Sequence, residues 1–126
     1  MEKIGRALIL EGDTKIATQL KALLSDQFGQ VIFAPDTAEA LKLLREKEIQ
    51  MAFVGDPSEG VSCFDLLKDL VRASPMTYVV LITDEPEEVI HEKAEGYGIL
   101  GHIPRAFASS HIQTLVNKYK QITKGL

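Results

Sequence analysis

The chain has 126 residues, of which 45% are hydrophobic and 25% charged, a composition typical of one folded globular domain. Eighteen acidic residues against fourteen Lys and Arg give a net charge of −4, which argues against a nucleic-acid surface, because such surfaces carry a basic patch or stripe. Cys63 is the one cysteine in the sequence, so no internal disulfide can form. We therefore expect residues 1–126 to form a single domain in a reducing compartment.

The N-terminal segment carries neither a targeting signal nor a membrane span. Met1–Arg6 leads into an apolar run of only four residues, which is too short for a signal peptide or a transmembrane helix. The sequence therefore predicts a cytoplasmic protein that makes no membrane contact.

Short apolar runs alternate along the chain with segments whose apolar residues recur at helical spacing. The predicted strands are, in chain order, Ala7–Leu10, Val31–Ala34, Met51–Gly55, Tyr78–Thr83 and Ile99–Ile103. A predicted helix follows each strand, and capping residues mark the five helix starts: Asp13 or Thr14, Asp36 with Glu39, Ser62 with Asp65, the acidic turn Asp84–Pro86, and Ser109 or Ser110. The pattern therefore predicts five strands and five helices in strict alternation.

Three residues define where two of these helices are expected to end. The apolar face of the first helix extends to Phe28, and Gly29 supplies a left-handed residue to stop it. The fourth helix has only a thin apolar stripe that ends at Tyr97, so we expect it to be the least firmly docked element.

Strands that alternate with helices through short connections predict an α/β fold with a parallel sheet and helices on both faces. The flavodoxin-like strand order 2-1-3-4-5 is the commonest arrangement for five strands, and a Rossmann-type order is the alternative.

Polar residues follow several of the predicted strands and should meet at the carboxyl edge of the sheet. Glu11–Asp13 follow the first strand, Gly55 and Asp56 the third, Thr83 the fourth and Arg105 the fifth. Carboxylates beside a hydroxyl and a cation suit a divalent metal and a phosphoryl group. The alternative is that these residues only cap the helices that follow.

At this point the chain resembles a response-regulator receiver domain. The resemblance rests on the order of elements, the acidic turn Leu8–Asp13, Thr83 at the end of the fourth strand, and Arg105 near Phe107. It implies an aspartate that accepts a phosphoryl group from a histidine kinase, with Mg²⁺ held by acids after the first strand. It also implies a Ser or Thr and a Lys that contact the phosphoryl group, and a switch aromatic on the fifth strand.

Carrying the family pattern over by position exposes several departures. Glu11 falls on the first acid, but Gly12 falls on the second, which leaves Glu11 and Asp13 as weak metal candidates. Gly55, and not Asp56, falls on the phosphoacceptor. Thr83 matches the family's phosphoryl contact. Arg105 replaces the lysine, and its planar fork is not equivalent to a compact ammonium group.

Two further positions carry competing interpretations. Asp56 is the candidate phosphoacceptor, but a shift of one residue along a strand turns a side chain to the other face, so we expect a turn residue that binds nearby backbone N–H groups. His102 falls on the switch aromatic. A half-buried, hydrogen-bonded histidine is the favoured interpretation there, and a pH- or partner-sensitive switch is the alternative.

These departures predict a signalling domain of the two-component type that is not an enzyme and acts by protein contact without standard aspartyl phosphorylation. The expected partner is a signalling protein or output domain, bound by the face of the fourth helix, fifth strand and fifth helix. The alternative is a phosphorylatable receiver that uses Asp56 with Mg²⁺. A flavodoxin-like small-ligand module is a weaker alternative, because the sequence has no GxGxxG and no Walker-type loop.

Overall fold

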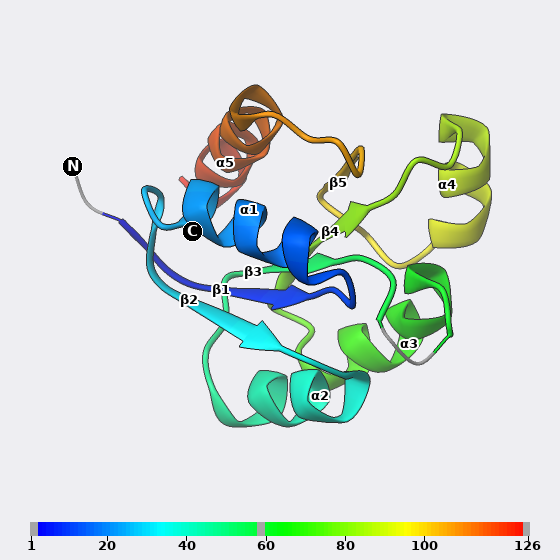
Figure 1. Cartoon of the computed structure of the whole chain (residues 1–126). Helices are drawn as coiled ribbons and strands as arrows, with labels where there is room; N and C mark the ends of the chain where they lie inside the picture. Colours follow the sequence, from blue (N-terminus) through cyan, green and yellow to red (C-terminus); the bar gives the residue numbers. More distant parts are fainter. Residues whose placement is uncertain (1–2, 58–59, 125–126) are drawn as a thin grey trace.

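The structure is a computed structural model that describes residues 3–57 and 60–124. The strands in this part of the chain form one parallel sheet (Figure 1). Its strand order is β2-β1-β3-β4-β5, which confirms the predicted flavodoxin-like arrangement. The strands are β1 (Ile4–Leu10), β2 (Phe28–Ala34), β3 (Met51–Val54), β4 (Tyr78–Ile82) and β5 (Gly101–Ile103).

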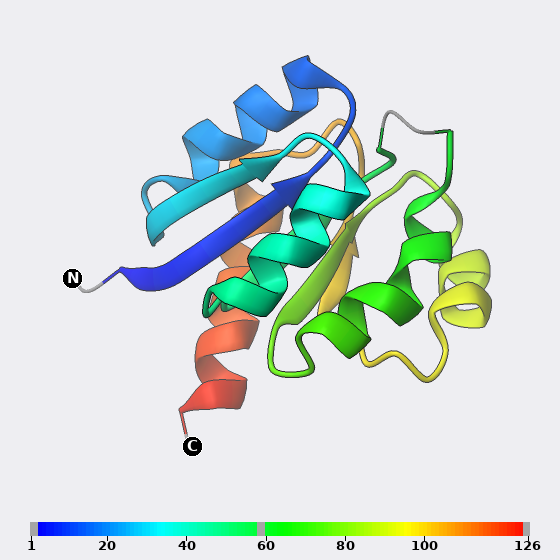
Figure 2. The ribbon, with the colours of Figure 1, turned by 90° about the horizontal axis from the view of Figure 1, so that it is seen from below.

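Helices cover both faces of the sheet, as Figures 1 and 2 show. They are α1 (Thr14–Leu24), α2 (Thr37–Glu46), α3 (Cys63–Ala73), α4 (Glu87–Ala94) and α5 (Ser109–Thr123). Helices α1 and α5 lie on one face, and α2 and α3 lie on the other, where α4 adjoins α3. None of the described helices is long and apolar enough to cross a membrane.

The central strands are buried on both faces, so alternate side chains enter two different cores. In β1, Leu8 and Leu10 pack toward α2 and α3, while Ala7 and Ile9 pack toward α1 and α5. In β3, Ala52 and Val54 belong to the first core, and Met51 and Phe53 belong to the second. This double burial explains why the strands are uninterrupted apolar runs in the sequence.

Three of the predicted helix caps are confirmed by hydrogen bonds. The Asp13 carboxylate accepts from the amides of Lys15 and Ile16 at the start of α1. The Asp36 carboxylate accepts from the amide of Glu39, and the Asp65 carboxylate accepts from the amide of Ser62. Each bond satisfies a backbone donor that a helix start or its cap would otherwise leave unpaired.

The end of the first helix was predicted wrongly. Helix α1 ends at Leu24, and Phe28 and Gly29 already belong to strand β2, where Gly29 is not in the left-handed region. Phe28 is still buried, but from the strand, where its ring meets that of Phe53 edge-on at 6.4 Å between centroids. A buried aromatic residue satisfies a helical and a strand pattern equally well, which explains the error.

Two boundaries near the C-terminus also differ from the prediction. Helix α4 ends at Ala94, so Tyr97 lies in the following loop, where Gly96 and Gly98 adopt positive φ angles. Ala108 precedes the first residue of α5, so neither Ser109 nor Ser110 is its N-cap. The His111 imidazole accepts a hydrogen bond from the Ala108 amide instead.

Replacement of Phe28 by alanine tests its place in the second core. Because the side chain is buried, we expect Phe28→Ala to lower the free energy of unfolding by about 3–5 kcal/mol. Phe33 lies on the same strand but is 42% exposed, so Phe33→Ala should cost less than about 1 kcal/mol. Urea denaturation measures both values, and equal losses would contradict the burial of Phe28 in the second core.

Candidate functional site

The carboxyl ends of the strands are joined by backbone hydrogen bonds at one edge of the sheet. The amide of Gly55 donates to the Leu10 carbonyl, and the amide of Gly12 donates to the Asp56 carbonyl, both at 2.8 Å. The amide of Thr83 donates to the Ile103 carbonyl at 2.9 Å. The segments that carry the predicted site residues are therefore held next to one another, as expected for parallel strands.

The centre of this edge is an ion pair between Glu11 and Arg105. The Arg105 guanidinium donates through Nη1 to Oε1 of Glu11 at 2.9 Å and through Nη2 to Oε2 at 3.0 Å. The side chain of Glu11 is only 1% exposed, whereas that of Arg105 is 26% exposed. This two-bond geometry matches a planar guanidinium to a carboxylate, which a lysine could not do.

Both members of the ion pair make a further hydrogen bond, Glu11 through its carboxylate and Arg105 through its backbone amide. The amide of Asp13 donates to Oε2 of Glu11 at 2.7 Å, so both carboxylate oxygens are satisfied. The hydrogen bonds to Glu11 raise the pKa of Arg105 above its ordinary value. The backbone amide of Arg105 also donates to the Asp84 carboxylate at 2.9 Å, which ties the loop after β5 to the loop after β4.

Gly55 makes room for this ion pair. A Cβ atom added at Gly55 would overlap Oε1 of Glu11 and would lie 3.3 Å from Nη1 of Arg105. Any side chain at position 55 therefore competes for the volume that the ion pair occupies. Glycine is required here for space, and the position that the receiver pattern gives to the phosphoacceptor is filled by the Glu11 side chain.

Asp56 and Asp13 both bind nearby backbone groups. The exposed Asp56 accepts a hydrogen bond through Oδ1 from the amide of Cys63, the first residue of α3, at 3.1 Å. This is the side-chain-to-backbone bond expected of a turn residue. Asp13 caps α1, as its position in the sequence suggested.

Thr83 and His102 are not among the hydrogen-bond partners given for Glu11 and Arg105. Thr83 is buried, and its Oγ1 accepts from the amide of Glu85 at 3.2 Å, within the loop after β4. His102 is exposed, so the expectation of a half-buried histidine was wrong. Because β5 is a three-residue edge strand, it leaves alternate side chains open to solvent.

The residues that the receiver pattern assigns to Mg²⁺ do not fit that ion here. Gly12 has no side-chain oxygen, the Glu11 carboxylate is already satisfied by three donors, and the Asp13 carboxylate caps α1. Among the described residues, no group of three or more His, Cys, Asp or Glu could hold a metal ion. We therefore derive no chemistry through a metal at this edge.

Sequence reasoning placed Glu11 and Arg105 at the same edge but assigned them to different ligands. Glu11 was a candidate for the metal, and Arg105 was a candidate for the phosphoryl group. Their sequence separation of 94 residues gave no direct sign that they bind each other. The available signal was the combination of a long carboxylate, an arginine in place of lysine, and a glycine where a side chain was expected.

The fold is matched by solved structures of other proteins. No protein-family model matches the chain, and no curated protein matches it. Among solved structures, the signal receiver domain of an HD domain-containing protein from Pseudomonas fluorescens Pf-5 has a TM-score of 0.78 at 20% identity, covering 100% of this chain and 96% of that chain.

Two further structures are similar to the same extent. A response regulator receiver domain from Clostridium thermocellum has a TM-score of 0.79 at 17% identity, covering 96% of this chain and 98% of that chain. The N-terminal signal receiver domain of a response regulator from Bacteroides fragilis has a TM-score of 0.80 at 18% identity, covering 93% and 98%. The chain therefore has the fold of a receiver domain over nearly all of its length.

A double-mutant cycle tests the space requirement at Gly55. We expect Gly55→Ala to cost about 3 kcal/mol of unfolding free energy, because the new methyl group displaces Glu11 from its buried pair. In a Glu11→Ala background the same change should cost at least about 1 kcal/mol less, since the competing carboxylate is gone.

Gly29→Ala is the matched control for this cycle. A Cβ atom at Gly29 would lie no closer than 3.4 Å to its neighbours, so this change should be nearly neutral in both backgrounds. Equal costs of Gly55→Ala with and without Glu11 would contradict the steric account. Urea denaturation of the variants supplies all of the values.

Cys63 gives a pH test of the same region. Burial, with a contribution from the nearby Asp56 carboxylate, raises the pKa of the Cys63 thiol to about 12. The unfolded thiol ionises near pH 8.5, so between these values the unfolded state loses a proton that the folded state keeps. The stability that this thiol contributes is complete below about pH 8.5 and declines as the pH approaches 12.

We therefore expect Cys63→Ala to reduce the loss of stability between about pH 8 and pH 10, at up to about 1.4 kcal/mol per pH unit. Urea denaturation across this range measures the slope. Identical slopes for Cys63→Ala and the unaltered chain would show that the thiol ionises as easily in the folded state.

Proposed function

We propose that this chain is a receiver-like domain of two-component signalling that acts through protein contacts and does not use aspartyl phosphorylation. The proposal is carried by the Glu11–Arg105 ion pair, which fills the volume next to Gly55. The resemblance to receiver domains places the phosphoacceptor at that position. In this chain a permanent carboxylate already lies against the cation that would contact a phosphoryl group.

The chemistry of phosphoryl transfer supports this proposal. Transfer to a carboxylate needs an available nucleophile and positive charge that neutralises the incoming oxygens. Glu11 is buried and bound by three donors, and the charge of Arg105 is compensated by Glu11. A phosphoryl group would have to displace Glu11, which would leave a buried charge without its partner at a cost of about 3–5 kcal/mol.

Asp56 is the remaining carboxylate to consider as an acceptor. Its Oδ1 holds the first amide of α3, and the carbonyl of the same residue holds the amide of Gly12. Phosphorylation of Asp56 would cost the α3 start a hydrogen-bond partner. These contacts support a structural role for Asp56.

The proposed partner is a signalling protein or an output domain, and the proposed contact surface is the face of α4, β5 and α5. Arg105 supports this assignment, because its amide is bound by Asp84 and its side chain by Glu11. The loops that precede α4 and α5 are thereby fixed without a phosphoryl group. In this proposal the face presents one constant conformation to its partner.

Incubation with acetyl phosphate and millimolar Mg²⁺ tests the proposal. We expect no gain of a phosphoryl group by intact-mass measurement and no saturable change in the amide chemical shifts of Gly55, Thr83 and Arg105. A receiver domain with a complete acid set is the positive control. A phosphoryl gain that Asp56→Asn abolishes would contradict the proposal and would establish the alternative, a phosphorylatable receiver that uses Asp56.

A further inference from the structure

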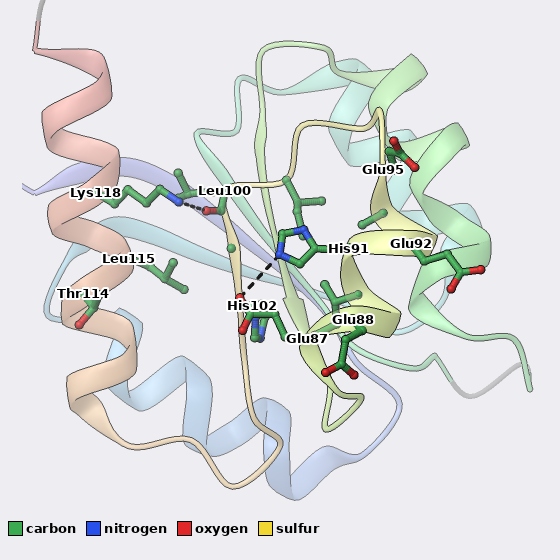
Figure 3. A pocket seen from close by; sticks show the side chains of 14 residues that line it. Glu87, Glu88, His91, Glu92, Glu95, Leu100, His102, Thr114, Leu115 and Lys118 are labelled. Carbon is green, nitrogen blue, oxygen red and sulfur yellow. Dashed lines mark hydrogen bonds and ion pairs between the residues drawn. The ribbon is translucent and has the colours of Figure 1, made fainter.

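A groove of about 940 Å³ runs between α4 and α5 over β5 (Figure 3). Its walls are α4 on one side and Thr114, Leu115 and Lys118 of α5 on the other. Gly101 and His102 of β5 lie between these walls. The groove is distinct from the Glu11–Arg105 pair, since neither residue lines it.

The groove exists because α4 packs beside α3 and stands apart from α5 (Figure 1). Among the described strands, β5 pairs only with β4, and its other edge lies along the groove. Helix α5 packs closely on β5 at Gly101, because a Cβ atom there would lie 2.7 Å from Cδ2 of Leu115. The apolar part of the lining is the half-buried Ile99 together with Ile90, Leu100 and Leu115, which are 3%, 3% and 7% exposed.

The charge of the groove is one-sided. Among the residues that line it, four glutamates lie on α4 or directly after it, and one residue is a lysine. With both histidines counted as neutral, these side chains give a net charge of −3. That lysine is Lys118, and its Nζ already donates a hydrogen bond to the carbonyl of Leu100, another residue of the lining, at 2.7 Å. The histidines are His91, 3.7 Å from the Glu87 carboxylate, and the exposed His102.

This charge distribution selects among possible occupants. A symmetric dimer through this face would bring the two acidic grooves together, because a two-fold interface places the same surface on both sides. Repulsion between the facing glutamates opposes such a dimer. A cationic partner is attracted by the glutamates, and their position on the α4 side orients its positive charges toward α4. The apolar floor adds a requirement for aliphatic side chains that can leave water.

We infer that the groove between α4, β5 and α5 binds a cationic amphipathic segment of a partner protein, in which Lys or Arg flank aliphatic side chains. This inference rests on the proposed function and specifies the chemistry of its partner. The aliphatic side chains lie over the lining between α4 and α5, and the cations lie along the glutamates of α4. The acidic wall supplies attraction and orientation, and the floor supplies the desolvated contact.

A synthetic amphipathic peptide with Leu and Lys at helical spacing is the first probe, and the same peptide with Glu in place of Lys is its counterpart. We expect the Lys peptide to shift the amide resonances of α4, β5 and Thr114–Lys118 in a saturable way. Its affinity should fall as salt is raised, since exposed charges are screened. Equal binding of the Glu peptide, or shifts centred elsewhere, would overturn the inference.

Three variants sharpen this test. Glu87→Gln with Glu88→Gln removes two groove charges, and we expect the affinity for the Lys peptide to fall about tenfold. Glu46→Gln with Asp69→Asn removes two charges on α2 and α3 and should leave the affinity unchanged. Thr114→Lys adds an opposing charge on α5 without altering α4, and it should weaken binding. Equal losses in the groove and control variants would contradict a specific site.

The titration is performed without a phosphoryl donor and repeated after acetyl phosphate treatment. Binding of the Lys peptide in both states supports the inference. Binding only after phosphoryl transfer would contradict the proposed function but keep the inferred partner chemistry. Failure to bind in either state would overturn the inference and would leave the phosphorylation result to decide the proposed function on its own.

Discussion

The buried side-chain carboxylate of Glu11 constrains the edge of the sheet at which the strands end. A charge that is 1% exposed must be compensated, because an unpaired buried carboxylate is strongly unfavourable. Glu11 is compensated by two guanidinium bonds from Arg105 and one amide bond from Asp13. That requirement explains why position 105 carries a bidentate donor, why position 55 has no side chain, and why the turn after β1 adopts its conformation.

The same constraint connects the edge to the face that we propose as the contact surface. Arg105 is bound at its side chain by Glu11 and at its amide by Asp84, so it joins the ends of β1, β4 and β5. The groove begins beyond these loops, where α4 diverges from α5. In our proposal, this ion pair holds the edge by a permanent contact, in the place where a receiver domain holds a transient phosphoryl group.

The sequence allowed the fold to be predicted because both periodicities are strong. Doubly buried strands are uninterrupted apolar runs, and Asp13, Asp36 and Asp65 stand where helix starts need acceptors. Phe28 was predicted in the first helix but begins β2. An apolar residue at this position indicates burial, and burial is compatible with a helix or a strand. The ion pair was not predicted because it depends on how two side chains 94 residues apart share one volume, which no local pattern encodes. Arg105 was placed at this edge, but its pairing with Glu11 was not predicted.

The most direct measurement of the central claim is the side-chain NMR spectrum of the Arg105 guanidinium. Two hydrogen bonds to Glu11 should slow rotation of the group, so we expect separate Nη resonances. These resonances should persist with Mg²⁺ and acetyl phosphate present and should merge in Glu11→Gln. A single averaged resonance in the unaltered chain, or one that changes when a phosphoryl donor is added, would contradict the claim that this ion pair permanently occupies the site.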